Sequence, residues 1–220
     1  MISTMRIIKE LIWKFLTVLK IAGVLQIMWK GKYLDSKGWF RSFYNKQSVD
    51  KNGNPIPWCS YPFIAFIQER LSKEMDVFEF GCGNSTHWYA SKVRSIKSVE
   101  HDLKWIEMLR QQLPTNASVV YKELVRNGDY SREVMLDQLK YHVIIIDGRD
   151  RENCVKNSIS CLTADGVIVF DNSQLLEYRN AIDFLKDQGF KRIDFYGLLP
   201  IVAHENCTTI FYRSNNCLGI

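Results

Sequence analysis

Apolar and polar residues follow two repeating patterns along most of this chain. Short apolar runs rich in β-branched residues indicate strands, and apolar residues at every third or fourth position indicate helices. The run Val143–Ile146 contains no polar residue, as expected for a strand buried on both faces of a parallel sheet. Alternating strands and helices predict an α/β fold, a doubly wound and mostly parallel sheet with helices on both faces. The expected strands are residues 77–80, 96–100, 117–121, 141–147, 167–172, 190–196 and 208–212.

Residues 5–30 show the pattern of one amphipathic helix instead. On a helical wheel, six polar side chains between residues 6 and 20 fall within one sector of roughly 140°, and apolar side chains such as Ile8, Leu11 and Phe15 occupy the rest. Lysines interrupt the apolar run, which argues against a membrane span, and no small-residue cleavage site of a secretory signal follows. The polar sector holds Arg6, Lys9, Glu10, Lys14, Thr17 and Lys20.

Charge is distributed unevenly along the chain. The net charge is +5 overall, while residues 1–51 carry ten Lys/Arg against three Asp/Glu. This basic block favours an acidic membrane or nucleic-acid surface, or is simply solvated. We expect the N-terminal helix either to lie on a membrane, as peripheral contact at the inner face, or to pack on the domain or on a second subunit as a homodimer. The packed arrangement is preferred.

The chain divides into two predicted regions. Residues 1–59 form a basic helical arm and an aromatic loop, and residues 60–220 form the main domain. The stiff segment Pro55–Pro62 either walls a substrate pocket or serves as a packed linker. Six cysteines without Cys-x-x-Cys spacing indicate free thiols in a reducing, cytoplasmic location.

The segment Val77–Thr86 is a buried strand that turns sharply into a helix. Gly81 and Gly83 permit a tight turn and the close approach of a ligand. Asn84, Ser85 and Thr86 are good helix N-cap residues, and the amide groups of a helix start suit a negative group. Glu79 supplies a carboxylate beside that turn for an ammonium or hydroxyl donor. A zwitterion such as the methionine part of S-adenosylmethionine fits both the helix start and the neighbouring carboxylate.

Acidic residues end four of the predicted strands: Glu79, Glu100, Asp147 and Asp171. Because parallel strands present their carboxyl ends at one edge, these acids should share a rim that accepts hydroxyl groups, ammonium groups or a divalent cation. Glu100 lies 19 residues after Gly81, which is the spacing of a ribose-binding acid.

These segments resemble the class I S-adenosylmethionine-dependent methyltransferases. The resemblance rests on Glu79–Thr86, Val99–Asp102 and Leu162–Asp171 and covers residues 60–213. It implies a Rossmann-like, seven-stranded sheet ending in an antiparallel hairpin. It also implies that the cofactor is bound by Glu79, Gly81, Gly83, Asn84, Ser85, Thr86, Glu100, His101 and Asp147, with Asp129 in a loop beside the adenine.

A narrower resemblance, to catechol-type O-methyltransferases, implies Mg²⁺ held by Asp147, Asp171 and Asn172. Oxygen ligands suit this ion. Alternatively, Asp147 and Asp171 cap the following helices, and Arg149 binds an acidic substrate group. Without a metal, the candidate general bases are Asp147, His101 and His204.

The resemblance implies a methyltransferase. The strand-end acids and the lack of a large substrate domain favour oxygen of a small-molecule or sugar-like molecule as the acceptor. The basic arm makes an acceptor at a membrane surface a further hypothesis. Two alternatives stay open, a nucleic-acid methyltransferase and a non-catalytic protein that keeps the cofactor-binding fold. Nucleic acid is not the preferred partner, because no Asn/Asp-Pro-Pro-Tyr-like segment follows the fourth strand.

Overall fold

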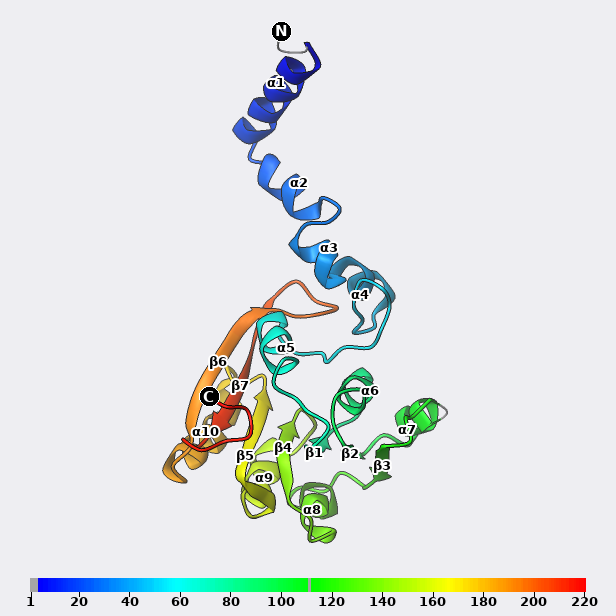
Figure 1. Cartoon of the computed structure of the whole chain (residues 1–220), viewed down its shortest axis with the longest axis vertical. Helices are drawn as coiled ribbons and strands as arrows, with labels where there is room; N and C mark the ends of the chain where they lie inside the picture. The colour runs from blue at the N-terminus through cyan, green and yellow to red at the C-terminus, as the bar shows by residue number, and fades with distance from the viewer. Residues whose placement is uncertain (1–3, 111) are drawn as a thin grey trace.

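The computed structural model describes residues 4–110 and 112–220, and their strands form one seven-stranded sheet in the order β3-β2-β1-β4-β5-β7-β6 (Figure 1). Strands β1 to β5 run parallel, while β7 runs antiparallel to both of its neighbours. The strands are β1 (Asp76–Phe80), β2 (Ser95–Glu100), β3 (Ala117–Tyr121), β4 (Tyr141–Ile146), β5 (Leu162–Asp171), β6 (Lys191–Leu198) and β7 (Glu205–Tyr212). The predicted sheet, including its terminal hairpin, is confirmed.

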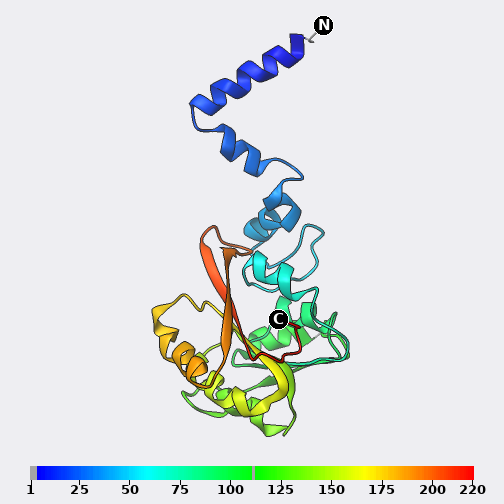
Figure 2. The same cartoon turned by 60° about the vertical axis from the view of Figure 1, so that its left-hand side comes forward.

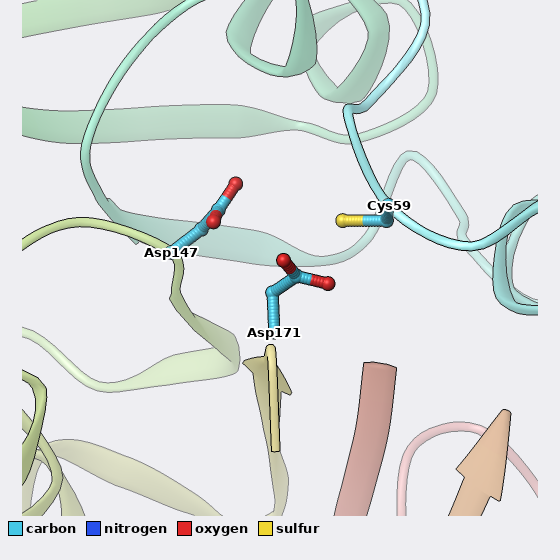
Figure 3. Close-up of side chains that lie close together, drawn as sticks. All are labelled: Cys59, Asp147 and Asp171. Atoms are coloured by element: carbon cyan, nitrogen blue, oxygen red, sulfur yellow. The ribbon is translucent and has the colours of Figure 1, made fainter. Parts of the chain in front are cut away.

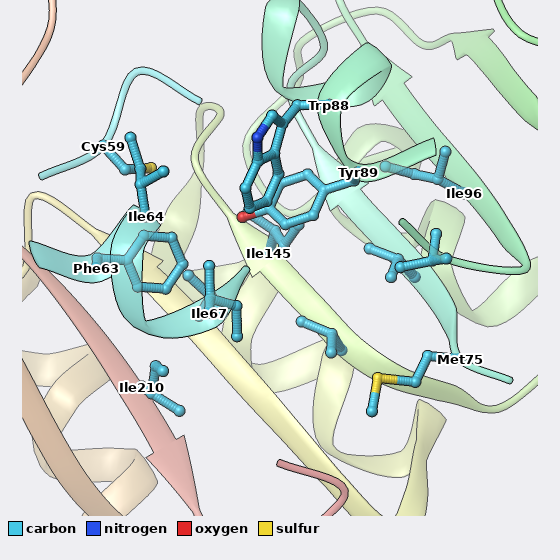
Figure 4. Close-up of a cluster of buried hydrophobic side chains, with 14 of the residues drawn as sticks. Cys59, Phe63, Ile64, Ile67, Met75, Trp88, Tyr89, Ile96, Ile145 and Ile210 are labelled. Atoms are coloured by element: carbon cyan, nitrogen blue, oxygen red, sulfur yellow. The ribbon is translucent and has the colours of Figure 1, made fainter. Parts of the chain in front are cut away.

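Helices cover both faces of the sheet because successive strand residues point to opposite sides. Ile145 packs with side chains of α5 and α6 (Figure 4), and Val77 belongs to the same cluster. Phe78 and Ile144 pack under α8 to α10 on the other face. The domain helices are α5 (Tyr61–Ile67), α6 (Asn84–Ala90), α7 (Leu103–Arg110), α8 (Asp129–Leu136), α9 (Arg151–Ser158) and α10 (Arg179–Asp187), with short 3-10 turns at Ile159–Cys161 and Leu176–Tyr178.

One local prediction is corrected by the structure. Residues 129–130, expected in a loop, begin α8, because Tyr130 and Val134 provide a buried face that the sequence pattern did not reveal. Strand β5 begins before the predicted residue 167, and its pairing with β4 shifts register between Leu162 and Val167.

The N-terminal arm is a chain of short helices and not one helix. It comprises α1 (Thr4–Val18), α2 (Ala22–Met28), α3 (Tyr33–Lys37) and α4 (Trp39–Asn45). The break after α1 coincides with Lys20, which takes a left-handed backbone conformation with φ of 59°. Among the described residues no single helix is long and apolar enough to cross a membrane; α1 and the segment 22–37 meet that test of length and composition only as a pair bent by 109°.

Two views show α1 and α2 extending away from the domain (Figures 1 and 2). Their apolar side chains are largely exposed, as Phe15 illustrates at 63 %. The expected packing of this helix on its own domain is therefore wrong, and the membrane and the second subunit remain as alternatives.

The chain joins the domain firmly after α3. The Trp39 Nε1 group donates a hydrogen bond of 2.8 Å to the Val202 carbonyl in the β6–β7 loop. The Asn84 side chain donates to the Ser48 carbonyl at 2.7 Å, and the Ser60 hydroxyl donates to the Phe195 carbonyl at 2.8 Å. Residues 39–60 thus attach to the edge of the sheet at which the parallel strands end.

That edge depends on a close approach between the loops after β1 and β4. Gly81 has a φ of +94°, and a side chain there would come within 3.4 Å of the Gly148 Cα atom. A Cβ atom at Gly148 would collide with the Tyr130 hydroxyl and lie 2.9 Å from the Gly81 nitrogen.

We expect Gly148→Ala to lower the free energy of unfolding by about 1–3 kcal/mol, the usual cost of overpacking. Thermal unfolding measures the loss, and adding Tyr130→Phe should recover part of it by removing the hydroxyl in the way. Gly23→Ala, with no atom within 4 Å of the added Cβ, is the control and should cause no loss. A Gly148→Ala protein as stable as the wild type would contradict this packing.

Candidate functional site

A cavity of about 1050 Å³ lies at the carboxyl edge of the parallel strands. Four parts of the chain line it: the strand ends and their loops, residues of α6 and α7, the N-terminal region from residue 45 to Trp58, and the β6–β7 loop. All four strand-end acids face it. This confirms that the acids share one rim. Pro55 and Trp58 line the cavity, as the pocket-wall alternative for the aromatic loop expects, whereas the wall from residues 45–49 was not predicted. The lining acids are Glu79, Glu100, Asp147 and Asp171.

The glycine turn forms the floor beside β1. The Gly81 amide donates to the Val99 carbonyl at 2.8 Å, which ties the turn to β2. Gly83, not one of the polar residues after it, occupies the N-cap position of α6, and its amide donates to the Thr86 hydroxyl at 3.1 Å. The predicted N-cap role of Asn84, Ser85 and Thr86 is thus corrected, because these residues already lie within the helix.

Glu79 is buried on the face of the sheet that α6 covers. Its carboxylate accepts hydrogen bonds from the hydroxyls of Ser85 at 2.5 Å, Thr86 at 2.6 Å and Ser98 at 2.8 Å. Burial raises the pKa of Glu79 from its usual 4.5 to about 7, although the three hydrogen bonds act in the opposite direction. Ser85 and Thr86 therefore hold Glu79, and Thr86 is fully buried and does not line the cavity.

Glu100 ends β2 and is held by the backbone that follows it. Its Oε1 atom accepts from the amides of His101 at 2.7 Å and Asp102 at 3.0 Å, and its Oε2 atom accepts from the Cys82 amide at 3.2 Å. The imidazole Nδ1 of His101 lies 2.6 Å from Oε1. Glu100 is thereby fixed beside the glycine turn, where the resemblance expects a ribose-binding acid.

Asp147 and Asp171 line the cavity, and one carboxylate oxygen of each lies within 4.8 Å of the other and of the buried Cys59 thiol (Figure 3). Burial and the neighbouring Asp171 raise the pKa of Asp147 well above its usual range. The buried guanidinium of Arg151 lies 3.3 Å from the Asp147 carboxylate and also donates to the backbone carbonyl of Asp171. A cationic side chain of the protein thus faces this pair of carboxylates.

The predicted magnesium site does not fit these contacts. Asp171 Oδ1 already accepts from Asn206 at 2.9 Å and Thr208 at 2.5 Å, and the Asn172 amide donates to Asn206. The third group that converges on the two aspartates is a thiol, which is not a ligand that Mg²⁺ favours. The Arg151 guanidinium already places positive charge 3.3 Å from the Asp147 carboxylate. The other prediction for these acids, helix capping, is also not observed. Asp150 holds the N-cap position of α9, and Leu175 and Tyr178 hold those of the 3-10 turn and α10 after β5.

The remaining predicted residues divide into two groups. His101, Asn172, Arg149 and His204 line the cavity, the last from the β6–β7 loop. Asp129 does not line the cavity; it is exposed at the start of α8.

Two important residues were missed by the sequence analysis. Trp105 of α7 lines the cavity and donates from its indole nitrogen to the Cys82 carbonyl at 2.7 Å. Arg151 lies in the same charged segment after β4 as Arg149, but the sequence predicted a functional role only for Arg149. Nothing in the pattern distinguished the two, because their burial depends on how α9 packs.

The burial of Glu79 predicts a pH-dependent stability. Between about pH 4.5 and 7 the unfolded carboxyl ionises while the folded one keeps its proton, so the free energy of unfolding should fall as pH rises. The fall should amount to about 1.4 kcal/mol for each unit of pKa difference. Denaturant titrations over this range should show a smaller fall for Glu79→Gln, while Glu10→Gln, which changes an exposed carboxyl of α1, should keep the wild-type profile. Parallel profiles for Glu79→Gln and wild type would contradict the assignment.

Neither a family model nor a curated protein matches this sequence. Solved structures do match its fold. A precorrin-6y C5,15-methyltransferase from Geobacter metallireducens has a TM-score of 0.55 at 16% identity, covering 70% of this chain and 87% of the other. A methyltransferase-like protein from Silicibacter pomeroyi has a TM-score of 0.50 at 18% identity, covering 73% and 90%. The fold is therefore that of the class I S-adenosylmethionine-dependent methyltransferases.

Proposed function

We propose that this chain, which has the class I methyltransferase fold, transfers a methyl group from S-adenosylmethionine to an oxygen atom of a small-molecule or sugar-like acceptor. One observation carries the proposal: a single cavity joins the glycine turn and Glu100 to the half-buried carboxylate of Asp147. The first two suit a methionine-and-ribose ligand, and the third suits a reacting hydroxyl.

The residues at the turn fit the cofactor. Gly83 has open space on its side-chain face, where an added Cβ would meet only Trp105, at 3.8 Å. Three backbone amides hold Glu100 in place, two on Oε1 and one on Oε2. About one of the four lone-pair sites of the carboxylate is then left, on Oε2, for a ribose hydroxyl. Glu79, with its raised pKa, becomes the partner of an ammonium group once ionised. S-adenosylmethionine supplies the electrophilic methyl group on its sulfonium.

Asp147 is the side chain best placed to take a proton from an acceptor. Its raised pKa makes it a stronger base than an ordinary aspartate, as general base catalysis at neutral pH requires. Arg151 holds its carboxylate, and Trp58, Leu199 and Val202 line the cavity with apolar surface. These walls would exclude water and align donor and acceptor.

The size of the cavity favours a small acceptor. Pockets for single drug-sized ligands measure about 300–1,000 Å³, so a cavity of about 1050 Å³ has room for the cofactor and one further small molecule. Residues 52–220 carry a net charge of −2, which does not favour a nucleic acid at the domain surface.

Cofactor binding is tested by calorimetry with S-adenosylmethionine. Gly83→Ala should weaken binding at least tenfold, because its Cβ occupies ligand space, and should lower the melting temperature only slightly, because alanine is a poorer N-cap residue than glycine. Glu100→Gln should weaken binding about tenfold or more, since hydrogen bonds to a charged group contribute about 1.5–3 kcal/mol. Gly23→Ala is the matched control for an added methyl group. Absence of binding by the folded wild type would refute every methyl-transfer version of the proposal.

Methyl transfer is tested with labelled S-adenosylmethionine and a panel of hydroxyl-bearing small molecules and sugars, with RNA as the competing acceptor. We expect Asp147→Asn to reduce the rate about 10²–10⁴-fold while cofactor binding persists, and EDTA to have no effect. If His204→Gln shows this loss while Asp147→Asn remains active, the general base is His204 and not Asp147. Cofactor binding without transfer to any acceptor would favour the non-catalytic alternative.

A further inference from the structure

Helices α1 and α2 present an apolar surface that no other part of the described chain covers. On α1 the exposed residues include Leu11 at 61 %, Phe15 at 63 % and Val18 at 79 %. On α2 they continue with Val24, Leu25, Ile27 and Met28, and Trp29 follows directly. Two views place both helices well away from the sheet (Figures 1 and 2). Surface of this kind on a protein marks an interaction site.

Basic side chains accompany this surface. Residues 4–32 contain six Lys/Arg and a single acid, Glu10. Glu10 pairs with Arg6 at 3.3 Å within α1. Lys9 and Lys14, in the same polar sector, have no acidic partner within residues 4–110 and 112–220. The surface therefore combines unshielded positive charge with a broad apolar face.

We infer that α1 and α2 are an interfacial membrane-binding unit that docks on an anionic lipid surface. An amphipathic helix with lysines on its polar face lies in the plane of the interface, with its apolar face among the acyl chains. Each basic residue near an anionic leaflet adds attraction. Neither helix has the length to cross the bilayer alone, so docking along the surface suits both of them.

A second copy of the chain is a poorer partner for the same surface. Two arms would bring together twelve Lys/Arg and only two Glu from residues 4–32. The apolar face of α1 spans all but about 140° of the helix, whereas a paired helix needs only a narrow seam. Anionic lipid supplies the missing negative charge and can cover the whole apolar face.

Docking would also position the cavity. The segment that follows α4 lines the cavity, and Trp39 of α4 is hydrogen-bonded to the β6–β7 loop that forms another wall. The arm therefore leaves the domain beside the cavity. Membrane binding itself is independent of methyl transfer and is tested separately from it.

Vesicle flotation of the full-length chain tests this inference, using phosphatidylcholine vesicles with and without phosphatidylglycerol at fixed ionic strength. Wild type should float with the anionic vesicles and at least tenfold less with the neutral ones. Replacing Leu11 and Phe15 by Asp should abolish flotation, and Lys9→Gln with Lys14→Gln should weaken it at least tenfold on anionic vesicles only. Leu176→Asp, which removes an 84 % exposed leucine from the domain, is the matched control and should float as wild type.

Three results would overturn the inference. The first is wild type that does not float with anionic vesicles, and the second is equal flotation of the Leu11/Phe15 variant. The third is a wild type that forms a stable dimer in light scattering and does not bind vesicles, together with a Leu11/Phe15 variant that is monomeric. Circular dichroism and S-adenosylmethionine binding, measured on every variant, separate a lost membrane contact from an unfolded domain and from failure of the proposed catalytic function.

Discussion

The whole site depends on the backbone contact between Gly81 and Gly148. Strands β1 and β4 are neighbours in the sheet, and the connections that leave their carboxyl ends run to α6 on one face and α9 on the other. The two loops can separate above the sheet only if they first pass each other closely. A Cβ atom at Gly148 would clash with its neighbours, and the φ of +94° at Gly81 disfavours any residue other than glycine. The cavity opens where they part, as expected for a topological switch point.

Burial of charge governs the chemistry of this cavity. Four carboxylates line this cavity, and the groups that contact them differ. Glu79 is satisfied by three hydroxyl groups and Glu100 by three backbone amides, while Asp147 faces Arg151. Removing carboxylates from water disfavours their charged form, so Glu79 and Asp147 hold protons at higher pH than ordinary acids do. A positively charged ligand beside Glu79 would favour the ionised form of its carboxyl group. Binding of the proposed cofactor would then release a proton from Glu79.

The arm differs from the domain in how its stability is obtained. Residues 39–60 are fixed by side-chain hydrogen bonds to the β6–β7 loop, the glycine turn and β6. Helices α1 and α2 lack such contacts and leave their apolar surface exposed. Isolated helices of this length are marginal in water, so an external surface that covers their apolar face would stabilise them. The segment between these two regions connects a proposed lipid contact to a wall of the cavity.

The sequence by itself determined the parallel sheet, the glycine turn and the gathering of acids at one rim, because strand periodicity and strand-end chemistry are local properties. It could not determine which residues meet across the cavity. Arg151 and not Arg149 contacts Asp147 because of how α9 packs. Asp129 is exposed because the neighbouring Tyr130 packs in the core. Residues 45–49 line the cavity because hydrogen bonds from Asn84 and Trp39 hold this part of the chain against the domain. Contacts between distant segments decided these outcomes, and no local pattern records them. The sequence thus predicted a ligand-binding turn at Gly81 and Gly83 and offered the aromatic loop as one wall, but the walls from residues 45–49 and α7 depended on the tertiary structure.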